Sequence, residues 1–227
     1  MRTMTCKALT TEHTMWSFCP SPGASILFTL LFIVTTCLHM LQAIYHRAWY
    51  SWVIIVSGLL QVATYLFRDL SIKYPANEAY YVLWFVLILI ASVWTNAFGY
   101  MVFSRMLWRY HPKRSIFHLK AWHYGTTFVI LDIFAFIVQI IGAAKAANPK
   151  ATLDDVMSGL HIYMGGVGIQ QIFIFGFCVV VLRFLWDVSR QRGKMDVSPA
   201  LILGWTLIGA LFFITVSKSL LRVDEWE

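Results

Sequence analysis

Residues 128–142, F-V-I-L-D-I-F-A-F-I-V-Q-I-I-G, decide the fold of this chain. The stretch is apolar enough to lie in a lipid bilayer, yet Asp132 stands near its centre and Gln139 follows seven residues later. Seven residues are about two helical turns, so both side chains fall on one helix face, with Gly142 beside it. A carboxyl group at mid-bilayer costs roughly 2.5–3.5 kcal/mol on insertion. Such a residue indicates either an interhelical hydrogen-bond lock or a substrate, ion or proton site.

The rest of the chain is similarly apolar. Of its 227 residues, 59% are hydrophobic and 13% are charged, whereas a soluble domain usually carries about a quarter charged residues. Long apolar runs recur from end to end, which predicts an all-α, polytopic transmembrane helix bundle. The net charge of +7 lies mainly between the apolar runs, where it serves membrane topology, so we expect no nucleic-acid partner.

Six membrane spans are predicted, at about residues 24–45, 50–67, 78–103, 122–142, 156–182 and 199–217. The loops after the first, third and fifth spans hold 10 Lys and Arg residues and two acidic residues. The segments on the other side hold 8 Lys and Arg residues and eight acidic residues. Two of these loops are densely basic, which places them in the cytoplasm. Residues 1–23 are therefore expected to form an extracytoplasmic segment, and residues 24–227 the helix bundle.

The four cysteines give two expectations. Cys6 and Cys19 lie in the N-terminal segment and can pair if that segment faces an oxidising compartment. Cys37 and Cys178 fall inside apolar runs, where cysteine acts as a small apolar filler.

Polar residues recur at helical spacing on the other spans as well. They are Gln61, Tyr65 and Arg68 on the second span, Ser92, Asn96, Tyr100 and Ser104 on the third, Gly159, Tyr163, Gly166 and Gln170 on the fifth, and Lys218, Arg222 and Glu225 at the end of the sixth. Gly165 and Gly168 thin the fifth helix on neighbouring faces, which predicts close helix packing there too.

This set of motifs resembles the fungal RTA-like family, named for resistance to aminocholesterol and also called lipid-translocating exporters. The resemblance rests on the Trp16-Ser17-Phe18-Cys19-Pro20-Ser21 entry, on Tyr65 and Arg68, and on Ala97, Tyr100 and Arg105. Its most specific part is Asp132, Gln139 and Gly142 on the fourth span, followed by Gly166 and Gln170, then Lys218, Arg222, Glu225 and Trp226.

The resemblance implies a membrane protein that moves, or confers resistance to, sphingoid long-chain bases or toxic sterol-like amphiphiles. We expect it in the plasma membrane, with membrane lipids or amphipathic amines as partners. Two departures stand out. Gln61 replaces a family glutamate, and the family has a seventh span after the Arg-x-x-Glu motif, whereas this chain ends at Glu227. The expectation is a truncated gene model or a shortened paralogue, unstable or inactive unless it oligomerises.

Two other functions compete with lipid export. One is a lipid-sensing receptor or regulator with a seven-helix-like bundle and no transport activity. The other is an intramembrane zinc hydrolase, which needs about three ligands, whereas the core offers only His39, His161 and Asp132 without paired histidine spacing. No G-x-x-x-x-G-K-[ST] motif is present for ATP hydrolysis by a P-loop. We expect no enzymatic activity, metal or cofactor.

The candidate substrate-binding or coupling residues are Asp132, Gln139, Gln170, Tyr100, Tyr65, Arg68, Gln61, Arg222 and Glu225. Among them Asp132 is expected to be neutral at rest, because a bare carboxylate at mid-bilayer is unfavourable. We expect it to bond to a tyrosine or glutamine such as Tyr100 or Gln170. Direct pairing with Arg68 would require helix bending or a water chain.

The predicted topology is testable at position 113, in the first dense basic loop. In intact cells carrying the Lys113→Cys variant, a membrane-impermeant thiol reagent should leave the new cysteine unlabelled, and it should label the cysteine once the membrane is permeabilised. Strong labelling before permeabilisation would reverse the orientation.

Overall fold

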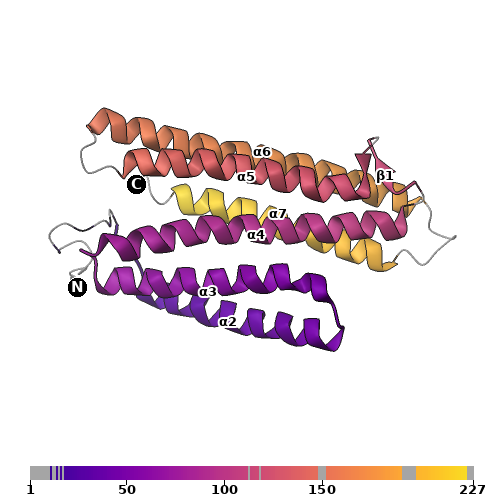
Figure 1. Ribbon diagram of the computed structural model, residues 1–227, viewed down its shortest axis with the longest axis horizontal. Helices are drawn as coiled ribbons and strands as arrows, with labels where there is room; N and C mark the ends of the chain where they lie inside the picture. The colour runs from indigo at the N-terminus through magenta and orange to yellow at the C-terminus, as the bar shows by residue number, and fades with distance from the viewer. Residues whose placement is uncertain are drawn as a thin grey trace. The chain divides into compact units, whose positions relative to one another are not determined.

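The computed structural model describes residues 11, 14, 16, 18–111, 113–117, 119–147, 152–190 and 198–223, with the side chains of the last helix described as far as Ala210. Apart from a helical turn at Trp49–Ser51 and a small hairpin, its regular structure is α-helical. The helices are α2 (Pro22–Tyr45), α3 (Trp52–Lys73), α4 (Glu78–Tyr110), α5 (Ala121–Ala146), α6 (Leu153–Ser189) and α7 (Ser198–Val223) (Figure 1).

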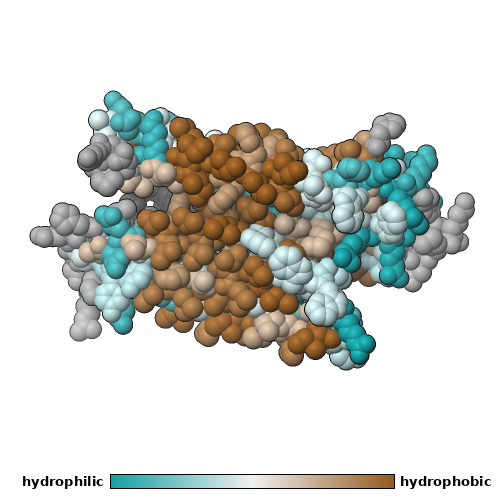
Figure 2. Space-filling view, in the orientation of Figure 1, coloured by the Kyte–Doolittle hydropathy of each residue, from teal (hydrophilic) through white to brown (hydrophobic). Residues whose placement is uncertain are grey.

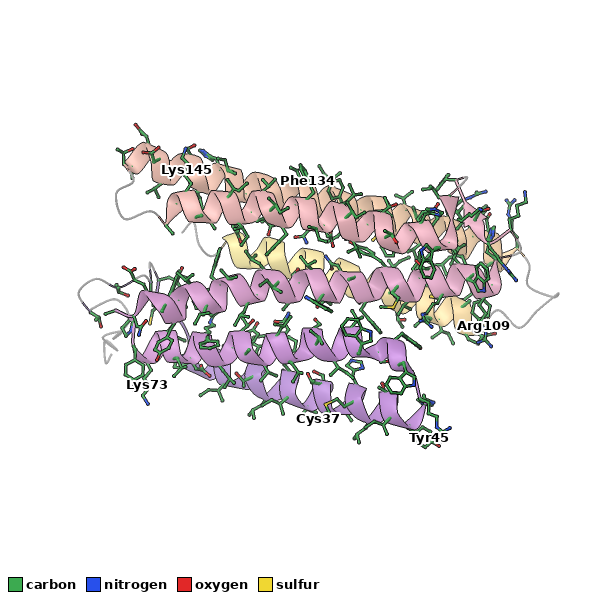
Figure 3. The ribbon with its side chains drawn as sticks, viewed as in Figure 1. Cys37, Tyr45, Lys73, Arg109, Phe134 and Lys145 are labelled. Carbon is green, nitrogen blue, oxygen red and sulfur yellow. The ribbon has the colours of Figure 1, made fainter. Side chains whose placement is uncertain are left out.

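Five of these helices, α2 to α6, are long and apolar enough to cross a membrane. In α7 the described side chains, Ser198–Ala210, form a further apolar stretch. Figure 2 shows hydrophobic side chains over the middle of the helices and hydrophilic ones toward their ends. Lys73, Arg109 and Lys145, labelled in Figure 3, lie in the last turns of α3, α4 and α5. The prediction of an all-α, multi-pass membrane bundle is confirmed.

The helices run past the ends of the predicted spans. Helix α3 reaches Lys73 rather than Phe67, and α4 reaches Tyr110 rather than Phe103. Charged residues end an apolar run without ending a helix, because their side chains reach water while the backbone bonding continues. Helix α3 stops where Tyr74 precedes Pro75, since proline disfavours helical geometry in the residue before it. The same extension carries α5, α6 and α7 to Ala146, Ser189 and Val223.

The first basic loop contains a hairpin that its sequence did not reveal. Strands β1 (Ser115–Ile116) and β2 (Leu119–Lys120) pair antiparallel, and Phe117 between them has a φ of 45°. The Tyr124 hydroxyl in the first turn of α5 donates to the Ile116 carbonyl, which fastens the hairpin to the helix. Strands of two residues are too short to produce an alternating pattern.

The chain forms two compact units, and the first comprises residues 1–98. In it α2 packs on α3, and a methyl group added at Gly58 would collide with the Thr36 hydroxyl. Helix α3 meets α4 through Ser57, whose hydroxyl lies 2.6 Å from that of Thr95 and bonds the Ala91 carbonyl at 3.2 Å. Small and hydroxylated residues suit helices that associate in lipid, because they allow close approach and polar contacts.

The second unit, residues 99–227, is built around aromatic rings. Phe177 of α6 lies edge-on to Tyr100 and Phe103 of α4, with ring centroids 4.6 and 5.2 Å apart. Phe103 makes similar contacts with Tyr124 and Phe184. Edge-to-face geometry brings the positive edge of one ring to the negative face of another, which stabilises the cluster beyond its apolar contact.

Helices α5 and α6 approach so closely that three glycines are required between them. A methyl group at Gly142 would collide with the backbone of Tyr163, and one at Gly159 would lie 2.6 Å from the Ala146 nitrogen. One at Gly166 would lie 2.9 Å from the Gln139 nitrogen. Around Gly165 and Gly168, by contrast, no described atom lies within 4 Å of an added methyl group. The close packing predicted for those two glycines is therefore wrong, because the described residues place no helix against their faces of α6.

The bonding and burial of the described cysteines agree with their positions in the sequence, except at Cys37. Cys19 is disulfide-bonded, while Cys6 lies outside the described residues. Cys178 is free and packs partly buried against the aromatic core, as an apolar filler would. Cys37 is also free but exposed on α2, so it fills no gap between helices (Figure 3).

The glycine contacts predict a sharp contrast within α6. The Gly159→Ala variant should lose about 1–3 kcal/mol of unfolding free energy, because the new methyl group overpacks against the α5 backbone. The matched control Gly165→Ala, on an open face of the same helix, should be neutral or slightly more stable. Thermal or denaturant unfolding in detergent measures both, and equal effects of the two variants would contradict the assigned interface.

Candidate functional site

Asp132 is wholly buried on the inner face of α5, 0% exposed. The hydroxyl of Tyr100, which is also 0% exposed, donates a hydrogen bond of 3.0 Å to its Oδ2 atom. The expectation that a tyrosine or glutamine would hold this carboxyl is met by Tyr100. A bond between two side chains shut away from water is worth more than the same bond at a surface, since water does not compete for either partner.

Aromatic rings pack against Tyr100 of this pair. The Tyr100 ring contacts Phe177 at 4.6 Å and Phe128 at 5.4 Å between centroids, and Phe128 itself contacts Phe177 at 5.1 Å. Tyr100 therefore has its ring fixed by packing and its hydroxyl directed at the acid. The helical spacing of the sequence supplies this geometry, because Tyr124, Asp132, Ala135, Gln139 and Gly142 all fall on the buried face of α5.

Two glutamines form a second polar contact on the same face. The Gln139 Nε2 atom donates to Gln170 Oε1 at 3.2 Å, and both side chains are buried. Gln170 thus binds Gln139 on α5, rather than Asp132 as one of the sequence-based alternatives held. Gly166 makes this contact possible, because it admits the α5 backbone at Gln139.

The candidate residues of α3 lie in the first unit and have other neighbours. Tyr65 stacks on Phe28 and Phe32 of α2, at 5.3 and 5.6 Å between ring centroids, so its ring belongs to the α2–α3 packing. Gln61 is partly buried and makes no side-chain hydrogen bond to the described part of the chain. The predicted set therefore divides into one group in each unit, with Asp132, Tyr100, Gln139 and Gln170 together in the second.

Arg68 occupies an aromatic setting that the sequence pattern did not indicate. Its guanidinium carbon lies 5.7 Å from the centroid of the Trp16 ring and 5.3 Å from that of Trp84. Trp16 is only 3% exposed, and its indole nitrogen donates to the Ser71 hydroxyl at 3.2 Å. The Trp-x-Phe entry motif thus ends in a tryptophan docked on α3 and α4. Trp84 carries no signal of its own in the sequence, because a single tryptophan in an apolar run is common in membrane helices.

Two further sets of candidates are the charged end of the last span and the possible metal ligands. Arg222 belongs to α7, but its side chain and the whole of Glu225 lie outside the described residues. Within the described residues, no three His, Cys, Asp or Glu side chains gather as metal ligands would.

A bundle of long apolar helices with a buried acid that is bonded to a tyrosine defines a multi-pass membrane protein. Within that class, the chain belongs to the RTA1-like protein family, whose sequence profile matches residues 54–227. The family expected from the sequence motifs is thereby confirmed.

Three relatives illustrate the similarity. The probable lipid transporter atnI of Emericella nidulans is 34% identical over 86% of this chain and 53% of its own length. Protoporphyrin uptake protein 1 of Saccharomyces cerevisiae is 24% identical over 92% of this chain and 78% of its own. The sphingoid long-chain base transporter RSB1 of Saccharomyces cerevisiae is 22% identical over 74% and 44%. The chain thus spans about half the length of the first and less of the third. No solved structure matches it.

The Tyr100–Asp132 bond predicts a coupling that unfolding experiments can measure. Tyr100→Phe should cost about 1–3 kcal/mol, because it removes the hydroxyl that donates to the buried Oδ2 atom of Asp132. Once Asp132→Asn has been introduced, the same change should have a different cost, and the double-mutant cycle gives the coupling energy. Tyr110→Phe is the matched control, since the Tyr110 hydroxyl bonds to no described residue. A coupling energy near zero would show that the hydrogen bond contributes nothing.

Proposed function

We propose that this protein moves amphipathic lipids across a membrane, and that its substrates are sphingoid long-chain bases or sterol-like amphiphiles that carry an amine. The names of two relatives support lipid transport in general. The relatives described above are named for transport or uptake, so we propose translocation without chemical conversion of the lipid.

The observation that carries this proposal is the enclosed Asp132 carboxyl. An acid in a membrane core is the natural partner for the ammonium head of an amphiphile, whose tail can stay in lipid. Because Asp132 and Tyr100 are both fully buried, the arrangement described here is closed to substrate. Access requires α4 and α5 to separate near Tyr100, so that the amine replaces the tyrosine hydroxyl at the carboxyl. The substrate would thus separate α4 from α5 by replacing the hydrogen bond that joins them.

This exchange would also couple transport of the substrate to a proton gradient. If Asp132 is neutral at rest, an arriving ammonium group displaces its proton and leaves a carboxylate–ammonium pair with the same total charge. One proton then leaves the site for each substrate that enters. Reprotonation of Asp132 from the opposite side would release the substrate. A proton gradient could thus drive export without ATP.

We further propose a plasma-membrane location with the N-terminal segment outside. The disulfide at Cys19 supports this orientation, because disulfides persist in oxidising compartments and are rare in the cytosol. The exposed end of an exporter would then face the medium into which the amphiphile is released.

A lipid-sensing receptor is the second candidate, and the same Tyr100–Asp132 hydrogen bond favours it. A ligand that breaks the Tyr100–Asp132 bond would loosen α4 from α5 and so convert binding into a change of helix packing. Such a protein would bind the amphiphile and leave it on the same side of the membrane.

The variant that separates these functions is Asp132→Asn, which keeps the side-chain shape and removes its titration. In proteoliposomes, the wild-type protein should move a fluorescent sphingoid base and shift the internal pH as it does so. Asp132→Asn should lower the initial rate at least about tenfold, as expected when a charge-assisted contact is lost. Asp154→Asn, an exposed acid in the first turn of α6, is the control and should transport normally.

Three results would count against the proposal. Full transport by Asp132→Asn would reduce Asp132 to a structural hydrogen-bond lock. Transport without a pH change would remove the proton from the mechanism. Tight binding of the base by wild-type protein without its movement would make the protein a receptor.

A further inference from the structure

Arg68 is a charged side chain of the membrane helix α3. It makes no ion pair or side-chain hydrogen bond within the part of the chain that the structure describes. Its Nε atom is buried and has no partner there. A guanidinium group presents its five N–H donors in a planar fork that matches carboxylate and phosphate oxygens. An Arg68 left without such a partner is therefore equipped to bind one.

A second unpaired donor lies beside it. The indole Nε1 of Trp84 is buried and has no hydrogen-bond partner among the described residues, and the Trp84 ring is 5.3 Å from the Arg68 guanidinium carbon. Buried N–H groups are almost always paired, so two unpaired donors in one cluster point to a missing acceptor. Oxyanions are the acceptors that can satisfy a cation and a neutral N–H together.

The aromatic rings around these donors form a firm apolar platform. The rings of Trp16 and Trp84 are parallel, with centroids 5.6 Å apart, and Tyr81 meets both rings edge-on at 5.3 and 5.4 Å. The hydrogen bond from Trp16 to Ser71 fixes the position of this platform on α3. Such rings suit the apolar part of an amphiphile and are the side chains favoured where membrane meets water.

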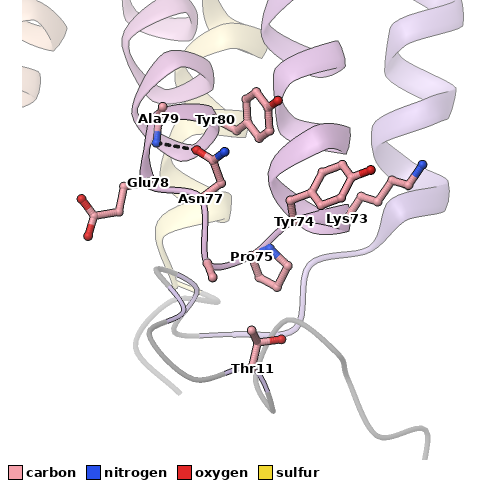
Figure 4. A pocket seen from close by; sticks show the side chains of 9 residues that line it. Thr11, Lys73, Tyr74, Pro75, Asn77, Glu78, Ala79 and Tyr80 are labelled. Atoms are coloured by element: carbon pink, nitrogen blue, oxygen red, sulfur yellow. Dashed lines mark hydrogen bonds between the residues drawn. The ribbon is translucent and has the colours of Figure 1, made fainter.

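The cluster also lies at the right depth. Arg68 precedes the last residue of α3, Lys73, by five positions, which is about 7.5 Å along the helix axis. Beyond it, the turn between α3 and α4 borders an open hollow of about 890 Å³, lined by Lys73 to Tyr80 and by Thr11 of the N-terminal segment (Figure 4). A head group entering from the aqueous side therefore has space next to the end of the helix.

We propose that Arg68 and Trp84 bind the oxyanion, phosphate or carboxylate, of an amphipathic ligand whose apolar part rests on the Trp16 and Trp84 rings. Asp69, the neighbour of Arg68, has a buried and unpaired Oδ1 atom. Its negative charge opposes a small free anion, so the apolar contacts are needed for binding. The site belongs to the first unit and is independent of the function proposed for Asp132.

Binding to the purified full chain in an uncharged detergent tests the proposal. The probes are a short-chain phosphatidic acid and laurate as the two oxyanion sources, a short-chain diacylglycerol as the uncharged lipid, and inorganic phosphate as the free ion. Native mass spectrometry counts the bound molecules, and titration gives the dissociation constants. We expect at least one of the two charged amphiphiles to bind, and the one that binds identifies the source of the oxyanion. The diacylglycerol and inorganic phosphate should bind at least about tenfold more weakly.

Three variants sharpen the test. Arg68→Gln should weaken binding at least about tenfold, since it removes the charge. Trp84→Phe keeps an aromatic ring but loses the N–H donor, and it should weaken binding about three- to fivefold. Lys145→Gln, a basic residue in the last turn of α5 in the second unit, is the matched control and should stay within about twofold. If Arg68→Gln does not fold, Trp84→Phe still decides the outcome.

Several results would overturn the proposal: wild-type binding of neither charged amphiphile, equal binding of the uncharged lipid or of free phosphate, or wild-type affinity in both Arg68→Gln and Trp84→Phe. None of them bears on the transport assay. A protein that binds the oxyanion yet moves no lipid would refute the function proposed for Asp132 and leave this site intact.

Discussion

The hydrogen bond between Tyr100 and Asp132 links α4 to α5 at a depth where neither lipid nor water offers another partner. Its formation requires the aromatic cluster to hold the Tyr100 ring, and it requires the buried face of α5 to turn inward. The same orientation of α5 brings Gln139 against Gln170, since the two residues lie where α5 and α6 face each other. Much of the second unit can thus be understood as the surroundings that one buried acid needs.

Two kinds of surface hold the helices of that unit together. Helices α5 and α6 use Gly142, Gly159 and Gly166 to bring their backbones into contact, which maximises dispersion contacts in a solvent without a hydrophobic effect between helices. Helices α4 and α6 instead interlock through the rings around Phe177. Backbone contact leaves little freedom to slide, whereas ring contacts can shift by small rotations. Opening on the α4 side of Asp132 therefore needs smaller rearrangements than opening on the α6 side.

Sequence spacing predicted the polar face of α5 correctly, because two helical turns always bring Asp132 and Gln139 to one side. It did not predict that Gln170 would bind Gln139, since partners on different helices depend on their relative register, which local spacing does not contain. Nor did it separate Gly166 from Gly165, because adjacent glycines look alike until a neighbouring helix covers one face. Helix ends were misplaced for a related reason. Hydropathy marks where lipid ends, whereas α3 continues until Tyr74 precedes Pro75 and α4 continues to Tyr110.

Asp132 and Arg68, the two ionisable residues that carry the proposals, have opposite surroundings. Asp132 is buried and bonded to Tyr100, so a ligand that bound it would first have to separate packed helices. Arg68 lies on aromatic rings near the end of α3 and has no ion pair within the described residues, so the ligand proposed for it would break no existing ion pair. A group that requires helix motion suits a step that must be gated. A group near the end of a helix that has no ion pair to break suits the first capture of a ligand, because less existing structure opposes binding.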